Sequence, residues 1–205
     1  MNKDEWKKRI AERNDMTTYL AHLTKPSEDG TSVQKVLLKI LKDKKLEGSG
    51  EKGFIVGNMK AVCLQESPLY SLTQNIYYEQ KLRKGEKTKK IRYLGFGLLF
   101  EKSFVFRNNG RPVIYDKTQE AKDYLPSNQW WRIVNLDLGN DDIIIDWTHE
   151  REWRVPNELK FELKDISVLV PNKNAYKYMI KICKKEGIDL INEVRGIINL
   201  QDLLI

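Results

Sequence analysis

Apolar and polar residues follow two different periods along this chain, and each period predicts a different kind of element. Apolar residues spaced three and four apart are typical of an amphipathic helix, whereas strict alternation is typical of a half-buried strand. The helical period predicts helices over residues 3–14, 33–46, 67–82, 118–125 and 171–187. Alternating or continuous β-prone runs predict strands over residues 16–24, 61–66, 91–100, 112–115, 159–163 and 166–170. Residues 53–57 suit a short strand or a loop, and residues 130–134 suit a strand or a buried helical turn.

Strands and helices do not alternate regularly in this order. A regular βαβα order would indicate a doubly wound parallel sheet, and its absence favours an α+β fold. The chain has 205 residues, which is long enough for one domain with a sizeable core. We therefore expect a single α+β domain over residues 1–205, with an N-terminal helical arm at residues 1–15 and a C-terminal helical end at residues 171–205.

Charged, aromatic and β-branched residues are most concentrated in the segment from Ile143 to Pro156. Three consecutive isoleucines open this segment and a proline closes it, which favours an extended strand over a helix. Alternate side chains of a strand share a face. One face would carry Asp146, Thr148, Glu150, Glu152 and Arg154, and the other would carry Trp147, His149, Arg151, Trp153 and Val155. The acidic face would line a cleft with paired carboxylates. The alternative is an exposed edge strand whose acids pair with the neighbouring arginines.

Net charge and cysteine content limit the binding partners and the cellular compartment that we expect. The chain carries 36 Lys and Arg residues against 29 Asp and Glu, a net charge of +7. Short lysine runs favour a polyanion such as nucleic acid, and the basic residues 83–90 could meet phosphates, although most such runs are solvated surface. Cys63 and Cys183 lie far apart, which indicates a reduced compartment without a disulfide framework or metal site. No apolar run approaches the roughly twenty residues that span a bilayer. No signal peptide opens the chain, so we expect a cytoplasmic protein without a membrane partner.

Several short motifs together resemble the ADP-ribosyltransferase superfamily, in particular the DarT-like bacterial toxins and the AbiGi-type phage-defence proteins. The motifs are scattered over residues 16–170 and comprise His22-Leu23-Thr24, the apolar run 36–41, the segment 61–70 and Glu150-Arg151-Glu152. The resemblance implies an ADP-ribosyltransferase-like split mixed β-sheet core with peripheral helices. It also implies an enzyme that uses NAD as its co-substrate.

The resemblance assigns roles to individual residues. By resemblance, His22 and Thr24 would hold the adenosine ribose or the nicotinamide part of NAD. Ser67, Tyr70 and Tyr93 are further candidate NAD-binding residues, and Tyr70, Tyr93 or Tyr115 could stack on nicotinamide or belong to the core. Glu152 would be the catalytic acid and Glu150 its partner, which orients the nucleophile. Cleavage of the nicotinamide–ribose bond passes through an oxocarbenium-like state, and a carboxylate beside the ribose stabilises that positive charge. A second carboxylate two residues earlier can accept the proton of the incoming nucleophile.

The resemblance predicts a toxin or phage-defence effector that modifies a macromolecule, with nucleic acid (RNA or DNA) as target and a cognate antitoxin protein as partner. DarT-like enzymes carry an arginine where this chain has Gln65-Glu66-Ser67, so the choice between RNA and DNA stays open. Two other functions remain possible from the residues. One is a non-catalytic antitoxin or binding module. The other is a metal-dependent nuclease that uses Asp146, Glu150 and Glu152 as oxygen ligands for magnesium.

Overall fold

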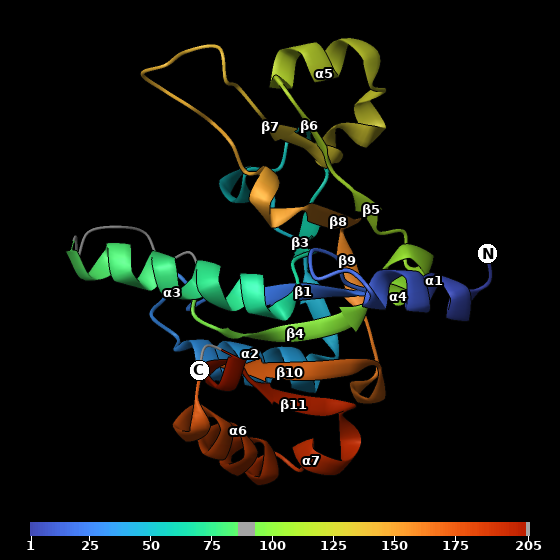
Figure 1. Ribbon diagram of the computed structural model, residues 1–205. Coiled ribbons are helices and arrows are strands. Elements are labelled where there is room, and N and C mark those ends of the chain that lie inside the picture. Colours follow the sequence, from blue (N-terminus) through green and yellow to red (C-terminus); the bar gives the residue numbers. More distant parts are fainter. Residues whose placement is uncertain (86–92, 204–205) are drawn as a thin grey trace.

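A mixed sheet of seven strands forms the centre of the computed structural model, which describes residues 1–85 and 93–203 (Figure 1). The strand order is β11-β10-β4-β1-β3-β8-β5. These strands are β1 (Tyr19–Thr24), β3 (Ala61–Gln65), β4 (Phe96–Glu101), β5 (Arg111–Pro112), β8 (Glu152–Pro156), β10 (Ile166–Val170) and β11 (Gly196–Asn199). The pair β10–β11 is parallel, and the other described pairs of this sheet are antiparallel. Together with the helices, this mixed sheet confirms the expected α+β class.

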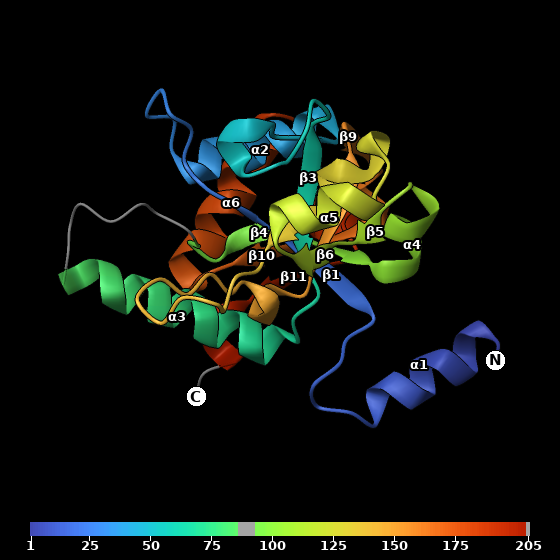
Figure 2. The ribbon, with the colours of Figure 1, turned by 90° about the horizontal axis from the view of Figure 1, so that it is seen from above.

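Helices cover both faces of the sheet. They are α1 (Lys3–Ala11), α2 (Val33–Asp43), α3 (Leu69–Gly85), α4 (Lys102–Arg107), α5 (Thr118–Tyr124), α6 (Lys173–Lys185) and α7 (Leu190–Glu193). Figure 2 shows α2 and α6 on one side of the sheet and α3 on the other. Leu37 and Leu41 of α2 are buried in the larger core cluster, while Leu72 and Ile76 of α3 belong to a second cluster. The sheet therefore separates two apolar layers.

Smaller elements complete the chain. Two-stranded sheets pair β2 (Lys45–Glu47) with β9 (Glu158–Lys160), and β6 (Ile114–Asp116) with β7 (Ile133–Asn135). The 3-10 helices are η1 (Glu51–Gly53), η2 (Ser127–Arg132), η3 (Thr148–Glu150), η4 (Leu163–Asp165) and η5 (Leu200–Leu203). In Figure 1 the segment from β6 to β7, which includes α5, stands above β3 and β8. No described helix is long and apolar enough to cross a membrane.

Local sequence explains where several elements begin and end. The side chain of Asn2 accepts hydrogen bonds from the second and third backbone amides of α1, which satisfies donors that a helix start leaves open. Asn172 caps α6 in the same way by accepting from the amide of Ala175 at 3.0 Å. Lys44 adopts the left-handed conformation, with φ 49°, and ends α2. Gly187, with φ 78°, follows the end of α6 as expected.

Some expected elements are wrong or were not foreseen. Of the two alternatives for residues 53–57 the loop is correct, because η1 ends at Gly53 and Gly57 has a positive φ of 84°. Helix α4 was not expected, since its six residues offer too short a window for a helical period. The C-terminal segment is not wholly helical, because β11 pairs with β10 inside the main sheet.

Strands β1 and β3 meet at one point only. Their register pairs Ala21 with Gln65. In contrast, β1 pairs with β4 at every residue from Tyr19 to Thr24. The two parts of the sheet, β11-β10-β4-β1 and β3-β8-β5, therefore join through a single paired position and diverge beyond it.

Candidate functional site

The segment from Ile143 to Arg151 is not the strand that the isoleucine run predicts. Asp146 accepts hydrogen bonds from the amide and the hydroxyl of Thr148, at 2.8 and 2.7 Å, and this turn opens η3. Arg151 then adopts the left-handed conformation with φ 46°, and β8 begins only at Glu152. The predicted alternation of faces is wrong for residues 143–151 because a local hydrogen-bonded turn replaces the extended backbone.

The kink at Arg151 leaves Glu150 in η3 and Glu152 at the start of β8, where the backbone of Glu152 contacts Tyr115. The hydroxyl of Tyr115, on β6, accepts the backbone N–H of Glu152 at 2.7 Å. Burial raises the pKa of Tyr115 to about 12, and the negative charges of Glu152 and Glu150 act in the same direction. Tyr115 is therefore bonded to the backbone of Glu152 and feels the charge of both acids, of which only Glu152 lies in the strand.

Glu152 is buried and paired with Arg154, two residues later on the same face of β8. The guanidinium donates from Nε to Oε1 at 2.7 Å and from Nη2 to Oε2 at 3.4 Å. Its remaining nitrogen Nη1 donates to the carbonyls of Trp131 at 2.7 Å and Ile133 at 2.9 Å. Glu152 is 7% exposed and Arg154 is 2% exposed. The edge-strand alternative is correct in pairing these two residues but wrong in placing the pair at the surface.

Tyr93 forms a hydrogen bond with the other carboxylate of the motif, that of Glu150. Its hydroxyl donates to Oε1 of Glu150. Burial raises the pKa of Tyr93, and the charge of Glu150 raises it further. The side chain of Gln65 acts in the opposite direction and lowers the pKa of Tyr93, and Gln65 is the register partner of Glu152 across β3 and β8. Gln65 therefore lies beside Glu152, and Tyr93 beside Glu150.

Cys63 lies two residues before Gln65 on β3. It pairs with Arg154 across β3 and β8, and burial, followed by the charge of Glu152, raises the pKa of the Cys63 thiol. The thiol is therefore held in its neutral form. Cys63 and Cys183 are both free thiols.

His22 and Thr24 lie on the opposite face of the sheet. Paired residues share a face, so the pairs Ala21–Gln65 and Gln65–Glu152 place those three side chains together. Strand alternation then directs His22 and Thr24 to the other side. The structure does not bring the His22-Leu23-Thr24 motif and Glu152 onto one surface. A ligand that contacts all of them must pass where β1 and β3 diverge.

Each of these two side chains has an unusual environment. His22 Nδ1 lies 2.9 Å from the carbonyl oxygen of Cys63, and because a carbonyl only accepts, Nδ1 carries the proton. Burial lowers the pKa of His22, so the ring is neutral. Thr24 is 4% exposed, and its hydroxyl has no hydrogen-bond partner within the described part of the chain. An unpartnered buried hydroxyl is costly, which marks Thr24 as a position that a ligand could satisfy.

Ser67 and Tyr70 flank the start of α3. The Ser67 hydroxyl donates to the carbonyl of His149 at 3.3 Å and ties this start to η3, the turn that carries Glu150. Ser67 therefore lies near the turn that carries Glu150. Tyr70 is 56% exposed, and its ring is on the outer surface of the helix.

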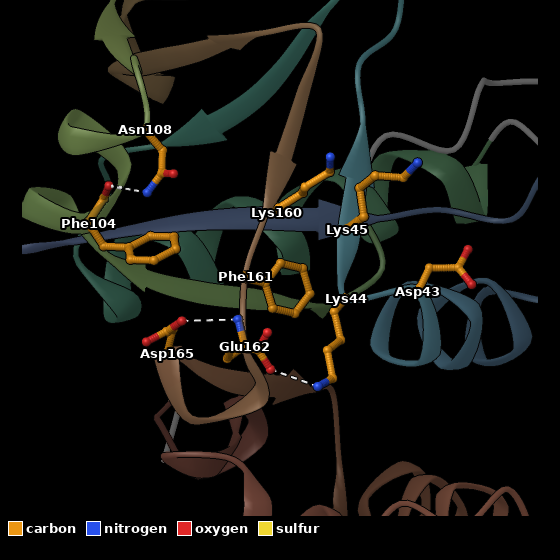
Figure 3. A pocket seen from close by; sticks show the side chains of 9 residues that line it. All are labelled: Asp43, Lys44, Lys45, Phe104, Asn108, Lys160, Phe161, Glu162 and Asp165. Carbon is orange, nitrogen blue, oxygen red and sulfur yellow. Dashed lines mark hydrogen bonds and ion pairs between the residues drawn. The ribbon is translucent and has the colours of Figure 1, made fainter.

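A hollow of about 700 Å³ lies elsewhere, between α2, α4, β2 and β9 (Figure 3). Figure 3 shows Phe104 and Phe161 with charged side chains around them. The lysines are paired with acids: Lys44 with Glu162 at 2.7 Å and Lys160 with Glu158 at 2.9 Å. No residue of the predicted NAD site lines this hollow. Its charges largely neutralise one another, so it offers no clear recognition chemistry.

Comparison with known proteins adds no relative. No family model, no curated protein and no solved structure matches the chain. Among residues 1–85 and 93–203, no group of three His, Cys, Asp or Glu side chains is arranged to hold a metal ion. The nuclease alternative, with Asp146, Glu150 and Glu152 as ligands, therefore has no supporting geometry in that part of the chain.

Sequence reasoning missed Gln65 and Cys63 as neighbours of the carboxylates. Both face Glu152 and Arg154 through the register of β3 and β8. Register between distant strands is not encoded in local spacing, and the one available signal was the polar character of Gln65 and Cys63 in an otherwise apolar strand. The pairing of Arg154 with Glu152 was readable from their separation of two residues, but the burial of the pair was not.

Proposed function

We propose that this protein is an NAD-dependent mono-ADP-ribosyltransferase with an ADP-ribosyltransferase-like split sheet. The observation that carries the proposal is that Glu150 and Glu152 lie on either side of Arg151 and are held separately, by Tyr93 and Arg154, with Glu152 next to the point where β1 and β3 meet. Two carboxylates with separate hydrogen-bond environments are what a reaction through an oxocarbenium-like state requires. The His22-Leu23-Thr24 and Glu150-Arg151-Glu152 motifs lie on β1 and at the start of β8, with β3 between them, and this order also supports the proposal.

The chemistry divides between the two acids. In the proposed reaction the bond between nicotinamide and the ribose C1′ breaks and its electron pair leaves with nicotinamide. Glu152, oriented by its ion pair with Arg154, stabilises the positive charge that develops on the ribose. Glu150, oriented by the Tyr93 hydroxyl, accepts the proton of the acceptor group as the new bond to C1′ forms. Arg154 acts through Glu152 and is a positioning residue.

The residues around the carboxylates suit the nicotinamide–ribose end of NAD. Tyr93 and Tyr115 place two aromatic rings beside the acids. Thr24 offers an unsatisfied buried hydroxyl on the other face, where the remaining part of NAD would lie if it crosses the break between β1 and β3. His22 is neutral and keeps Nε2 as a hydrogen-bond acceptor.

The proposed target is nucleic acid, RNA or DNA, and the proposed role is a toxin or phage-defence effector in the cytoplasm. The net charge of +7 supports a polyanionic target. A toxin of this kind is expected to have a cognate antitoxin protein. Expression of the intact chain should then arrest bacterial growth, and Glu152→Gln should relieve the arrest.

The test is transfer of label from NAD to separate pools of RNA, DNA and cellular protein. The intact protein should label the nucleic-acid pools, and Glu152→Gln should abolish the label. The matched control is Glu158→Gln, because Glu158 also belongs to a strand and is paired with lysines, but at the surface. Absence of label in every pool would overturn the proposal, and label in the protein pool alone would overturn the nucleic-acid target.

One observation favours a second candidate, a non-catalytic binding module such as an antitoxin. The ion pair with Arg154 engages both oxygens of Glu152, and a carboxylate in that state serves the fold even without turnover. The two candidates differ in NAD binding, which titration calorimetry measures directly. A protein that binds no NAD but forms a tight complex with another protein would establish the binding module.

A further inference from the structure

Helix α3 carries an aromatic and basic stripe along its outer face. Tyr70, Tyr77 and Tyr78 are 56%, 62% and 59% exposed, and Lys81 and Lys84 are exposed beyond them. At 100° per residue these five side chains fall on one side of the helix. The opposite side holds the buried residues that anchor α3 to the sheet. We refer to Tyr70, Tyr77, Tyr78, Lys81 and Lys84 as the α3 stripe.

The fold does not account for this stripe. Three rings exposed by more than half contribute little to the core, and aromatic side chains of this size are usually more buried. Neither Lys81 nor Lys84 forms an ion pair with a described residue, whereas lysines of the hollow in Figure 3 are paired with acids. Tyr77 also borders a hollow of about 430 Å³ that reaches Pro171 at the end of β10. The stripe therefore combines open aromatic rings, positive charge that no described acid neutralises, and an adjoining depression.

We propose that the α3 stripe binds single-stranded nucleic acid. Bases stack on exposed tyrosine rings, and lysines beside them neutralise phosphates. The bases of a duplex are stacked within it and cannot reach a ring on a helix surface, so the ligand is single-stranded. From Tyr70 to Lys84 the stripe runs about 21 Å along the helix axis, which is enough for several nucleotides.

The stripe begins next to the proposed active site. The Ser67 hydroxyl, just before α3, donates to the carbonyl of His149 in η3. Glu79 on α3 lies close enough to Tyr93 for its charge to raise the pKa of that hydroxyl. Figures 1 and 2 show α3 extending from there to the edge of the molecule. The inference deepens the proposed function, because it names the surface that would present a nucleic-acid acceptor to Glu150.

The first experiment measures binding of fluorescein-labelled dT12 and U12 by anisotropy, with no NAD present. The intact protein should bind at least one of them and should bind a duplex of equal length less well. Tyr70→Ser/Tyr77→Ser/Tyr78→Ser should weaken binding by about tenfold or more, since each stacked ring contributes substantially. Tyr178→Ser is the control, because Tyr178 is 44% exposed on α6, a helix with its own exposed lysines.

The second experiment separates phosphate contacts from non-specific charge. Lys81→Gln/Lys84→Gln should lower the slope of log K against log salt by about 1.4, that is, by about 0.7 for each phosphate contact with a single strand. Lys181→Gln/Lys185→Gln on α6 removes the same charge at another exposed place and should leave the slope within error. Circular dichroism and thermal melting confirm that the variants, all at exposed positions, remain folded.

The outcomes distinguish this inference from the proposed transferase. Binding that depends on the α3 stripe, in a protein that does not cleave NAD, would support the surface and overturn the enzyme. Cleavage of NAD without oligonucleotide binding would overturn the surface and leave the enzyme. Equal losses of binding in the α3 and α6 variants would show general electrostatic attraction and would also overturn the surface.

Discussion

The buried pair of Glu152 and Arg154 allows a quantitative test of the site. Replacing Arg154 by Met removes two hydrogen bonds to Glu152 and two to the carbonyls of Trp131 and Ile133. Methionine keeps much of the side-chain volume but donates no hydrogen bond. The carboxylate of Glu152, only 7% exposed, would then remain without its cation.

The expected loss is large. Removing one partner of a buried ion pair costs about 3–5 kcal/mol, because the other charge stays buried and unpaired. Urea unfolding at pH 7, followed by tryptophan fluorescence, gives the free energy of unfolding and its dependence on urea. Arg154→Met should lose about 3–5 kcal/mol, and Glu152→Met/Arg154→Met should recover most of it because no buried charge remains.

The chain offers a matched control on β9. Lys160 and Glu158 are paired at 2.9 Å and, like Arg154 and Glu152, are two residues apart on one strand. Their side chains are exposed, by 75% for Lys160 and 35% for Glu158. Exposed pairs contribute at most about 1 kcal/mol, so Lys160→Met should cost less than that. Equal losses for Arg154→Met and Lys160→Met, or a double variant less stable than Arg154→Met, would refute the reasoning that burial makes the Glu152 pair essential.

Two further predictions concern β1. Thr24→Val removes a buried hydroxyl that has no partner in the described structure, so the free energy of unfolding should stay equal or rise by about 1 kcal/mol, while the KM for NAD should rise; a loss of stability with unchanged KM would show that the hydroxyl serves the fold. Burial lowers the pKa of His22, so as the pH falls the unfolded chain binds a proton at this histidine and the folded chain does not. Its contribution to stability is present above pH 6.5 and is lost as the pH falls. Between pH 7.5 and 5.5 this loss amounts to at most about 1.4 kcal/mol, and it should be absent in His22→Asn; equal pH dependence of unfolding in both proteins would contradict it.

Sequence pattern predicted the elements whose apolar residues recur at a clear period. Helix α2 is amphipathic and strand β10 is wholly buried, and both were expected close to their actual bounds. The strand that the isoleucine run at 143–145 predicts is wrong, because the turn that Asp146 forms with Thr148 overrides the β propensity of the run. Ile143 and Ile144 are more than half exposed in the resulting loop.

The candidate site was predictable only in part for a related reason. The spacing of Glu150 and Glu152 is local and could be read from the sequence. Their separate environments, with Glu150 bonded to Tyr93 and Glu152 to Arg154, depend on the left-handed conformation of Arg151, for which arginine has no intrinsic preference. The placement of His22 on the other face from Glu152 depends on the register of β1, β3 and β8. Long-range register is set by the packed fold and leaves no periodic signal.

Release of nicotinamide from NAD is the most direct measure of the central claim that Glu152 is the catalytic acid of an ADP-ribosyltransferase. Purified protein is incubated with NAD and total cellular nucleic acid, and free nicotinamide is quantified by chromatography. The intact protein and Glu158→Gln should release nicotinamide at equal rates, and folded Glu152→Gln should release none above the blank. No release by the intact protein, or undiminished release by Glu152→Gln, would contradict the account.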